Sequence, residues 1–267
     1  MKNLITTFCM LFISLSAFSQ EIAYQEKKDM TYTSNGDAYS RERCKIDIYY
    51  PAGKKDFTTL IWFHGGGLTG GNKEIPDYLK NKGIAIVGVG YRLSPQVKVE
   101  DIIQDAADAV KWTFEHIAEY GGNMRKIALG GHSAGAYLSL MLGLNRSYLA
   151  DRNISTEMLL GIASLSSQAI THFTARKEKG LTEFQPTVDE LAPLFWVRKD
   201  APPILLITGD RELEMVGRYE ENAYLKRMLR LVGHPNVKLL ELDGYDHGMT
   251  YPAYPLLLRE LENWTKK

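Results

Sequence analysis

Residues 131–135 read Gly-His-Ser-Ala-Gly, which places a serine between two glycines. A short apolar run begins at Ile127, and a helical pattern follows directly after the second glycine. The sequence therefore indicates a sharp turn from strand to helix with Ser133 at its apex. Glycines on both sides let the backbone and the neighbouring helix approach closely. A serine hydroxyl lifted clear of a sheet in this way is suited to nucleophilic attack.

Such a serine needs a base to take its proton and an acid to orient that base. His247 follows the expected strand 237–242, and Asp210 follows the apolar run 203–208. Residues directly after parallel strands converge at one edge of a sheet, even when they are distant in sequence. We therefore expect Ser133 as the nucleophile, His247 as the base and Asp210 as the acid.

Other carboxylates compete with Asp210 for the role of the acid. Glu212 and Glu214 come later in the same loop as Asp210, and Asp243 and Asp246 share the loop of His247. Asp210 is favoured because it lies nearest the end of its strand.

A second glycine-rich stretch, His-Gly-Gly-Gly at 64–67, directly follows an apolar run. The tetrahedral intermediate of acyl transfer carries an oxyanion that backbone amides can bind. The amides of Gly66, Gly67 and Ala134 are suited to that role, because no bulky side chain intrudes at the glycines and Ala134 directly follows the nucleophile. His64 is expected to order this loop by hydrogen bonding, whereas His132 is expected to point away from Ser133.

From about residue 29 onwards, apolar runs alternate with helical patterns. Strands are expected at 30–33, 44–50, 58–63, 84–90, directly before Ser133, and at 159–165, 203–208 and 237–242. Helices are expected at 74–82, 99–117, 134–144, 219–232 and 254–264. This order predicts an α/β fold, with a mostly parallel central sheet and helices on both faces.

The N-terminal residues predict a signal peptide at 1–19, because Lys2 precedes a mostly apolar run that ends in Ala-Phe-Ser. We expect cleavage after Ser19 and export to the periplasm or the medium. The remaining residues, 20–267, suit a single domain, in which 166–202 form an excursion over the strand ends or a small lid. Cys44 would then be the only cysteine, so no internal disulfide can form.

The 32 basic and 32 acidic residues balance, and they form no basic stripe. Nucleic acid and anionic membrane surfaces are therefore poor partners, and no stable membrane insertion is expected. A small-molecule or carbohydrate substrate fits better. Leu68, His172 and Met249 are the candidate substrate-binding residues, while the oligomeric state stays open.

These motifs, together with Tyr91-Arg-Leu93, Gly209-Asp210 and Asp246-His-Gly248, resemble the α/β-hydrolase superfamily. The similar branch contains hormone-sensitive-lipase-like carboxylesterases, bacterial feruloyl and acetyl esterases, and kynurenine formamidase-like enzymes. The resemblance implies the α/β-hydrolase fold and a serine hydrolase that acts through an acyl-enzyme without metal or cofactor. Many hormone-sensitive-lipase-like esterases have Asp where this chain has His132, which favours the compact feruloyl- or acetyl-esterase-like branch.

The expected function is that of an exported serine hydrolase of carboxylic esters, with acetyl or feruloyl esters of carbohydrates as the substrate class. An aryl formamidase similar to kynurenine formamidase is the nearest alternative. A small serine peptidase and a catalytically idle, hydrolase-like binding protein are the others.

Overall fold

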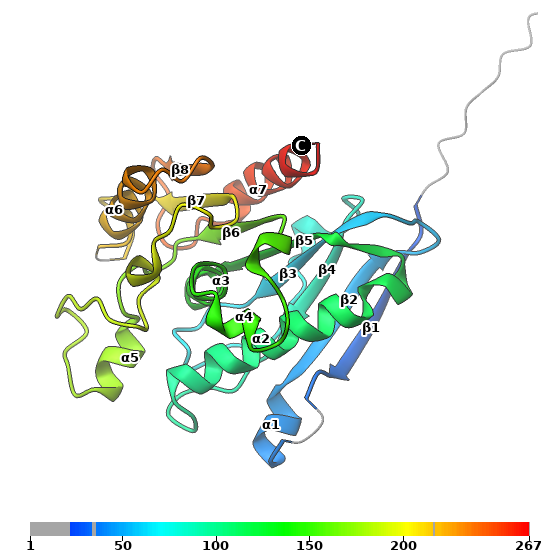
Figure 1. The fold of residues 1–267 in the computed structure, drawn as a ribbon, viewed down its shortest axis with the longest axis horizontal. Coiled ribbons are helices and arrows are strands. Elements are labelled where there is room, and N and C mark those ends of the chain that lie inside the picture. The colour runs from blue at the N-terminus through cyan, green and yellow to red at the C-terminus, as the bar shows by residue number, and fades with distance from the viewer. Residues whose placement is uncertain (1–21, 34–35, 216, 267) are drawn as a thin grey trace, which may run out of the picture.

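The computed structural model describes residues 22–33, 36–215 and 217–266, and the expected signal peptide at 1–19 lies outside them. The chain builds one eight-stranded sheet in the order β1-β2-β4-β3-β5-β6-β7-β8 (Figure 1). β1 and β4 both pair antiparallel with β2, and every pairing from β4 to β8 is parallel. The strands are Tyr24–Thr31 (β1), Lys45–Pro51 (β2), Phe57–Phe63 (β3), Ala85–Val89 (β4), Gly122–His132 (β5), Gly161–Leu165 (β6), Ile204–Gly209 (β7) and Val237–Leu242 (β8).

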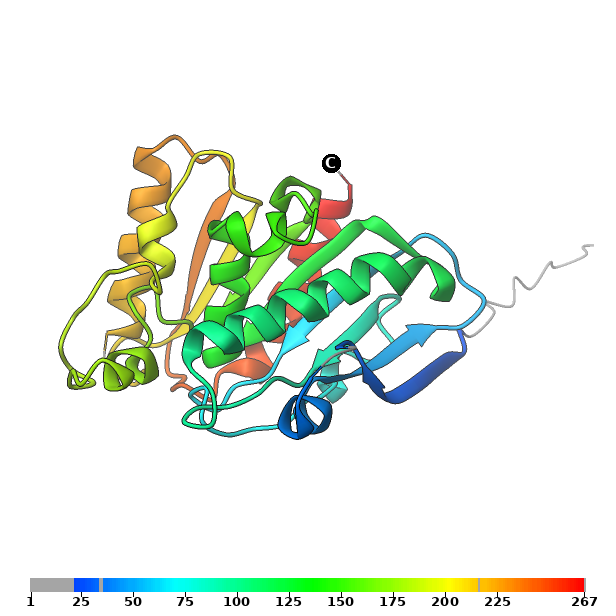
Figure 2. The same ribbon diagram turned by 60° about the horizontal axis from the view of Figure 1, so that its bottom comes forward.

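Helices cover both faces of this sheet, which confirms the α/β fold (Figure 2). α2, α3 and α6 pack on one face, and α7 packs on the other. The helices are Ala38–Arg43 (α1), Val99–His116 (α2), Ala134–Leu144 (α3), Ser147–Ala150 (α4), Phe173–Glu178 (α5), Arg218–Leu231 (α6) and Thr250–Thr265 (α7). Short 3₁₀ turns are Asp77–Leu79 (η1), Ile117–Tyr120 (η2), Thr156–Met158 (η3) and Pro193–Trp196 (η4).

The central strand β3 shows how the core is divided between the two faces. Successive side chains of a strand point to opposite sides of the sheet. Ile61 and Phe63 accordingly pack in the core beneath α2 and α3, while Leu60 and Trp62 pack beneath α7. All of β3 is buried, as the largely apolar run at 58–63 predicts for a strand covered on both faces.

Most expected strands and helices overlap those of the structure, although α7 begins at Thr250 instead of Tyr254. Residues 74–82 form only the turn η1 instead of a short helix, because a residue that precedes a proline, here Ile75 before Pro76, is disfavoured in helical conformation. Between the first two strands the chain adds α1, which is capped by the side chain of Asp37 accepting from the amide of Ser40. The first strand lies at 24–31 instead of 30–33.

Residues 166–202 run over the carboxyl edge of the sheet and contain α5 and η4. They begin directly after β6 and end just before β7, so they connect two neighbouring parallel strands. In the part of the chain that the structure describes, no helix is both long and apolar enough to cross a membrane.

The tight packing of α3 against β3 gives a testable prediction. A Cβ at Gly135 would lie 1.9 Å from the backbone oxygen of Phe63, which cannot move without distorting β3. We expect Gly135→Ala to lower the free energy of unfolding by roughly 3 kcal/mol, measured by chemical denaturation.

Gly70→Ala is the matched control, since the nearest atom to its Cβ would lie 3.9 Å away. This variant should change the free energy of unfolding by less than about 1 kcal/mol. Equal destabilisation by the two substitutions would contradict the packing argument.

Candidate active site

The turn at Ser133 has the strained geometry that the sequence predicts. β5 ends at His132, α3 begins at Ala134, and Ser133 between them has φ 56° and ψ −118°. A positive φ is costly for a residue other than glycine and is held only by the surrounding structure. Here the amide of Ser133 donates to the carbonyl of Leu165 on β6, at 2.8 Å, and its carbonyl accepts from Tyr137 on α3.

His247 lies where the base was expected. It sits in the loop between β8 and α7, and its Nε2 is 3.0 Å from Oγ of Ser133. This distance allows the serine hydroxyl to donate a hydrogen bond to the imidazole. The structure thus brings together two residues that are separated by 114 positions in the sequence.

The carboxylate behind His247 belongs to Glu214 and not to Asp210. Oε1 of Glu214 lies 2.7 Å from Nδ1 of His247, and the Glu214 side chain is 1% exposed. A neutral imidazole that donates from Nδ1 carries its lone pair on Nε2, which is the atom that faces Ser133. Glu214 therefore holds the ring in the tautomer that a general base requires.

The expectation for Asp210 is wrong, because the chain makes a helical turn directly after β7. The amide of Glu214 donates to the backbone oxygen of Asp210, at 2.7 Å, and this turn carries Glu214 back over the strand end. The Asp210 carboxylate instead accepts from the amides of Glu212 and Gly244, each at 2.9 Å. Asp210 therefore ties the loop of the acid to the loop that follows β8.

Burial opposes ionisation of Glu214, but its hydrogen bonds outweigh that effect and lower its pKa to about 2. Its donors are His247, the hydroxyl of Ser166 at 2.7 Å and the amides of Met215 and Gly209 at 2.8 and 3.1 Å. Each of these bonds favours the charged form of the carboxyl group. Glu214 is consequently a carboxylate throughout the neutral pH range.

Ser166 is a polar contact of the site that the sequence reasoning missed. Its Oγ donates to Glu214 and lies 2.8 Å from Nδ1 of His247, so it touches both members of the pair. Ser166 directly follows β6 and has φ 53°. The rule that pointed to Asp210, a polar residue directly after a parallel strand, would have found it.

The two histidines near the serine have supporting positions. Nε2 of His132 donates to the backbone oxygen of His247 at 2.8 Å, so it fixes the loop that carries the base. Nδ1 of His64 donates to the oxygen of Gly65 at 2.6 Å, and its ring stacks on Tyr91, as expected for a residue that orders the glycine loop. Burial lowers the pKa of both His64 and His132 to about 4.

The glycine loop lies against the serine. A Cβ at Gly65 would be 3.5 Å from the Cβ of Ser133. Gly66 and Gly67 have φ 115° and 64°, values that favour glycine. Within the described residues, the amides of Gly66, Gly67 and Ala134 donate to no other group, so they are free to bind an oxyanion.

The three residues expected to contact the substrate are fully buried. The carbonyl of Leu68 accepts from the amide of Ser94, and Met249 packs in the core beneath α7. His172 caps α5, where its Nδ1 accepts from the amide of Thr174. Their places in the sequence predict nearness to the site, but their side chains point into the packed interior.

Comparison with known proteins agrees with this fold. The BD-FAE family model matches residues 46–167, which include the glycine loop and the serine turn. A truncated form of a carbohydrate esterase from gut microbiota superposes with a TM-score of 0.75, at 18% identity, over 93% of this chain and 99% of that one. This chain has the α/β-hydrolase fold.

Two curated relatives are esterases. Esterase LipC of Mycobacterium tuberculosis is 28% identical over 73% of this α/β-hydrolase and 55% of its own length. An acetyl esterase of Salmonella choleraesuis is 33% identical over 39% of this chain and 33% of its own. The chain thus spans about half or less of the length of these relatives.

The hydrogen bond between Glu214 and His247 leads to a testable prediction. Glu214→Gln removes the charge opposite the imidazole and lets the ring adopt the wrong tautomer. We expect kcat for p-nitrophenyl acetate to fall roughly 10³-fold with little change in KM, measured by initial rates.

Asp210→Asn provides the comparison, because the amide keeps the size of the side chain and has no contact with His247. Its kcat should stay within about tenfold of the native value. A larger decrease in kcat for Asp210→Asn than for Glu214→Gln would assign the role of the acid to Asp210.

Proposed function

We propose that this α/β-hydrolase is a serine carboxylic ester hydrolase that works through an acyl-enzyme. The observation that carries the proposal is the continuous hydrogen-bonded chain from Glu214 through His247 to Ser133, with distances of 2.7 and 3.0 Å. The named esterases among the relatives support the same reaction class.

In the proposed reaction, Oγ of Ser133 attacks the ester carbonyl while Nε2 of His247 takes the hydroxyl proton. The imidazolium that forms is stabilised by the ionised Glu214. It then gives its proton to the leaving alcohol, which departs as the acyl-enzyme forms. A water molecule, deprotonated by the same imidazole, attacks the acyl carbon and releases the acid and the free serine.

The amides of Gly66, Gly67 and Ala134 bind the oxyanion of both tetrahedral intermediates. Loss of one such donor typically reduces kcat by about 10²- to 10³-fold. Side-chain substitution cannot remove a backbone amide, but the positive φ of the two glycines would be strained for any larger residue, so the loop is sensitive to substitution.

Acetyl or feruloyl esters of carbohydrates are the substrate class that we propose. Support comes from the BD-FAE match, from the acetyl esterase among the relatives and from the carbohydrate esterase among the solved structures. Export to the periplasm or medium is proposed from the N-terminal pattern at 1–19 alone. An exported esterase would act on substrates in the periplasm or in the medium.

A substrate panel tests the reaction class. We expect turnover of p-nitrophenyl acetate and methyl ferulate, and little turnover of N-formylkynurenine or an aminoacyl nitroanilide. A fluorophosphonate should label the native protein, and Ser133→Ala should lose both labelling and activity. Preferred turnover of N-formylkynurenine would make the protein a formamidase, and absence of both turnover and labelling would make it a binding protein.

The pH dependence gives a second prediction. Between about pH 5 and pH 7, none of Glu214, His64 and His132 should add a protonation step to kcat/KM, because the pKa values of all three lie below this window. Glu214, with a pKa of about 2, stays ionised throughout that window. His64 and His132, with pKa values of about 4, stay neutral. A slope greater than one in the pH dependence of kcat/KM for p-nitrophenyl acetate would contradict this expectation.

A further inference from the structure

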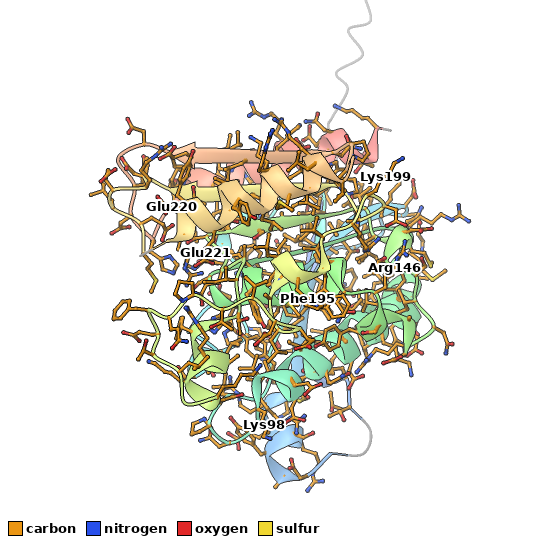
Figure 3. The ribbon with its side chains drawn as sticks, turned by 60° about the vertical axis from the view of Figure 1, so that its left-hand side comes forward. Lys98, Arg146, Phe195, Lys199, Glu220 and Glu221 are labelled. Atoms are coloured by element: carbon orange, nitrogen blue, oxygen red, sulfur yellow. The ribbon has the colours of Figure 1, made fainter. Side chains whose placement is uncertain are left out.

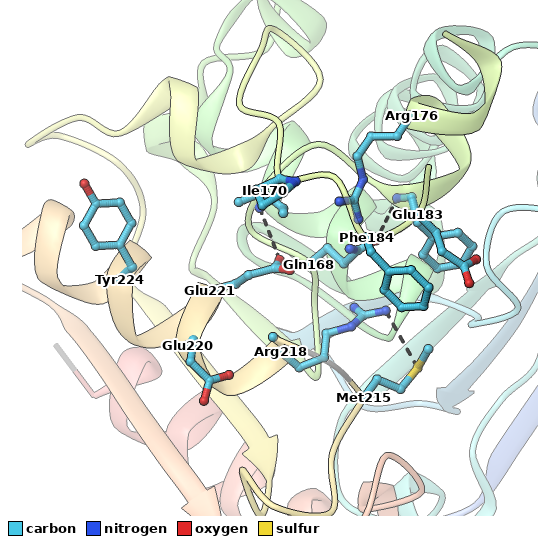
Figure 4. A pocket seen from close by; sticks show the side chains of 13 residues that line it. Gln168, Ile170, Arg176, Glu183, Phe184, Met215, Arg218, Glu220, Glu221 and Tyr224 are labelled. Atoms are coloured by element: carbon cyan, nitrogen blue, oxygen red, sulfur yellow. Dashed lines mark hydrogen bonds between the residues drawn. The ribbon is translucent and has the colours of Figure 1, made fainter. Parts of the chain in front are cut away.

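A cavity of about 580 Å³ lies between α5, the loop that follows it and the start of α6 (Figure 4). Aromatic and aliphatic side chains form most of its wall, among them Ile170, Phe184 and Tyr224. Figure 3 shows the same side of the molecule, with Glu220 and Glu221 at the beginning of α6. None of these residues takes part in the reaction described above.

The cavity adjoins the active site at two points. Met215, which lines it, directly follows Glu214 and donates its amide to that carboxylate. Phe173 also lines it, and its ring would lie 3.0 Å from a Cβ placed on Gly67 of the glycine loop. The cavity therefore borders both the loop that carries Glu214 and the glycine loop.

Two buried arginines reach into the cavity from different helices, Arg176 from α5 and Arg218 from α6 (Figure 4). They are 3% and 1% exposed. A buried guanidinium needs hydrogen-bond acceptors and a compensating charge, because removing it from water is costly.

The acceptors present do not satisfy these two groups. Nη1 of Arg176 donates to the carbonyl of Gln185 at 2.8 Å, but its Nε is buried with no hydrogen-bond partner. Nη1 of Arg218 donates to the carbonyl of Ser166 at 2.9 Å, whereas its Nη2 has the thioether sulfur of Met215, at 4.0 Å, as its contact. A thioether is a weak acceptor.

The nearby carboxylates do not compensate the charges directly. Glu221 accepts from the amides of Ala169 and Ile170 through one oxygen, at 2.8 and 3.3 Å. Glu183 pairs with Lys177 at 2.9 Å, and Glu220 is exposed to solvent. Among the described residues, neither arginine forms an ion pair with any carboxylate.

We propose that the cavity is a substrate subsite that binds a carboxylate, with Arg176 as its ligand and Arg218 beside it. A carboxylate would supply the missing hydrogen-bond acceptors, in a geometry that matches the planar guanidinium. The apolar wall suits the ring to which that carboxylate is attached. The preferred substrate is therefore an ester of an acidic sugar, such as an acetylated uronic acid, and this inference rests on the proposed esterase function.

Two matched substrates test the subsite, namely acetylated glucuronic acid and acetylated glucose, which differ by a carboxylate in place of a hydroxymethyl group. Release of acetate by the full-length protein should show a kcat/KM at least about tenfold higher for the glucuronic acid ester. Arg176→Gln should remove this preference, chiefly by raising KM for the glucuronic acid ester more than KM for acetylated glucose. Arg176→Lys should restore part of it.

Lys199→Gln is the matched control, because Lys199 is an exposed cation that lies at the other end of α6 from Glu220 and Glu221 (Figure 3). It should leave the preference unchanged. A second measurement needs no variant: free glucuronate, and not glucose, should inhibit hydrolysis of p-nitrophenyl acetate by the native protein.

Equal kcat/KM for the two sugar esters, or an equal loss of both in Arg176→Gln, would overturn the subsite and assign Arg176 a structural role. Another outcome is that the protein hydrolyses p-nitrophenyl acetate without being inhibited by free glucuronate and without preferring the glucuronic acid ester. In that case the proposed subsite is wrong and the proposed esterase function stands. If no ester is hydrolysed, the proposed function itself fails.

Discussion

The buried carboxylate of Glu214 is the charge on which the arrangement of the strand ends depends. An isolated carboxylate in the interior would cost several kcal/mol, and it would be expected to take up a proton instead. Here the hydroxyl of Ser166, Nδ1 of His247 and the amides of Gly209 and Met215 all donate to it. These donors follow or end β6, β7 and β8, so satisfying one charge fixes three loops relative to each other.

This constraint also explains the geometry at the nucleophile. His247 can face Ser133 only if its other nitrogen keeps the hydrogen bond to Glu214, and His132 holds the backbone of the same loop from the opposite side. Ser133 is in turn held in its strained conformation by a hydrogen bond to β6. Positioning of the reacting atoms is therefore shared between the sheet, which fixes the serine, and the buried carboxylate, which fixes the base.

The sequence predicts the elements well because their signals are local. The all-apolar helix α3 and the strand β8 have the ends that their patterns indicate, and Ser133 and His247 are identified by short motifs next to them. The acid is different, because its identity depends on the path of a loop. Asp210 and Glu214 are separated by one helical turn, and only a backbone hydrogen bond between them decides which carboxylate faces the imidazole. The periodicity of the sequence does not predict this hydrogen bond.

The residues that line the binding site could not be predicted from the sequence, for a related reason. Leu68, His172 and Met249 lie close to the reacting groups along the chain, but side-chain direction is set by packing, and all three face the interior. The side chains that do line a cavity come from segments whose composition is mixed in charge and aromatics. Arg218 connects the two regions, because it lines this cavity while donating to the carbonyl of Ser166, whose hydroxyl binds Glu214. Incompletely satisfied polar groups in an otherwise well-satisfied interior are typical of functional sites, and here Arg218 is joined through Ser166 to the carboxylate that holds His247.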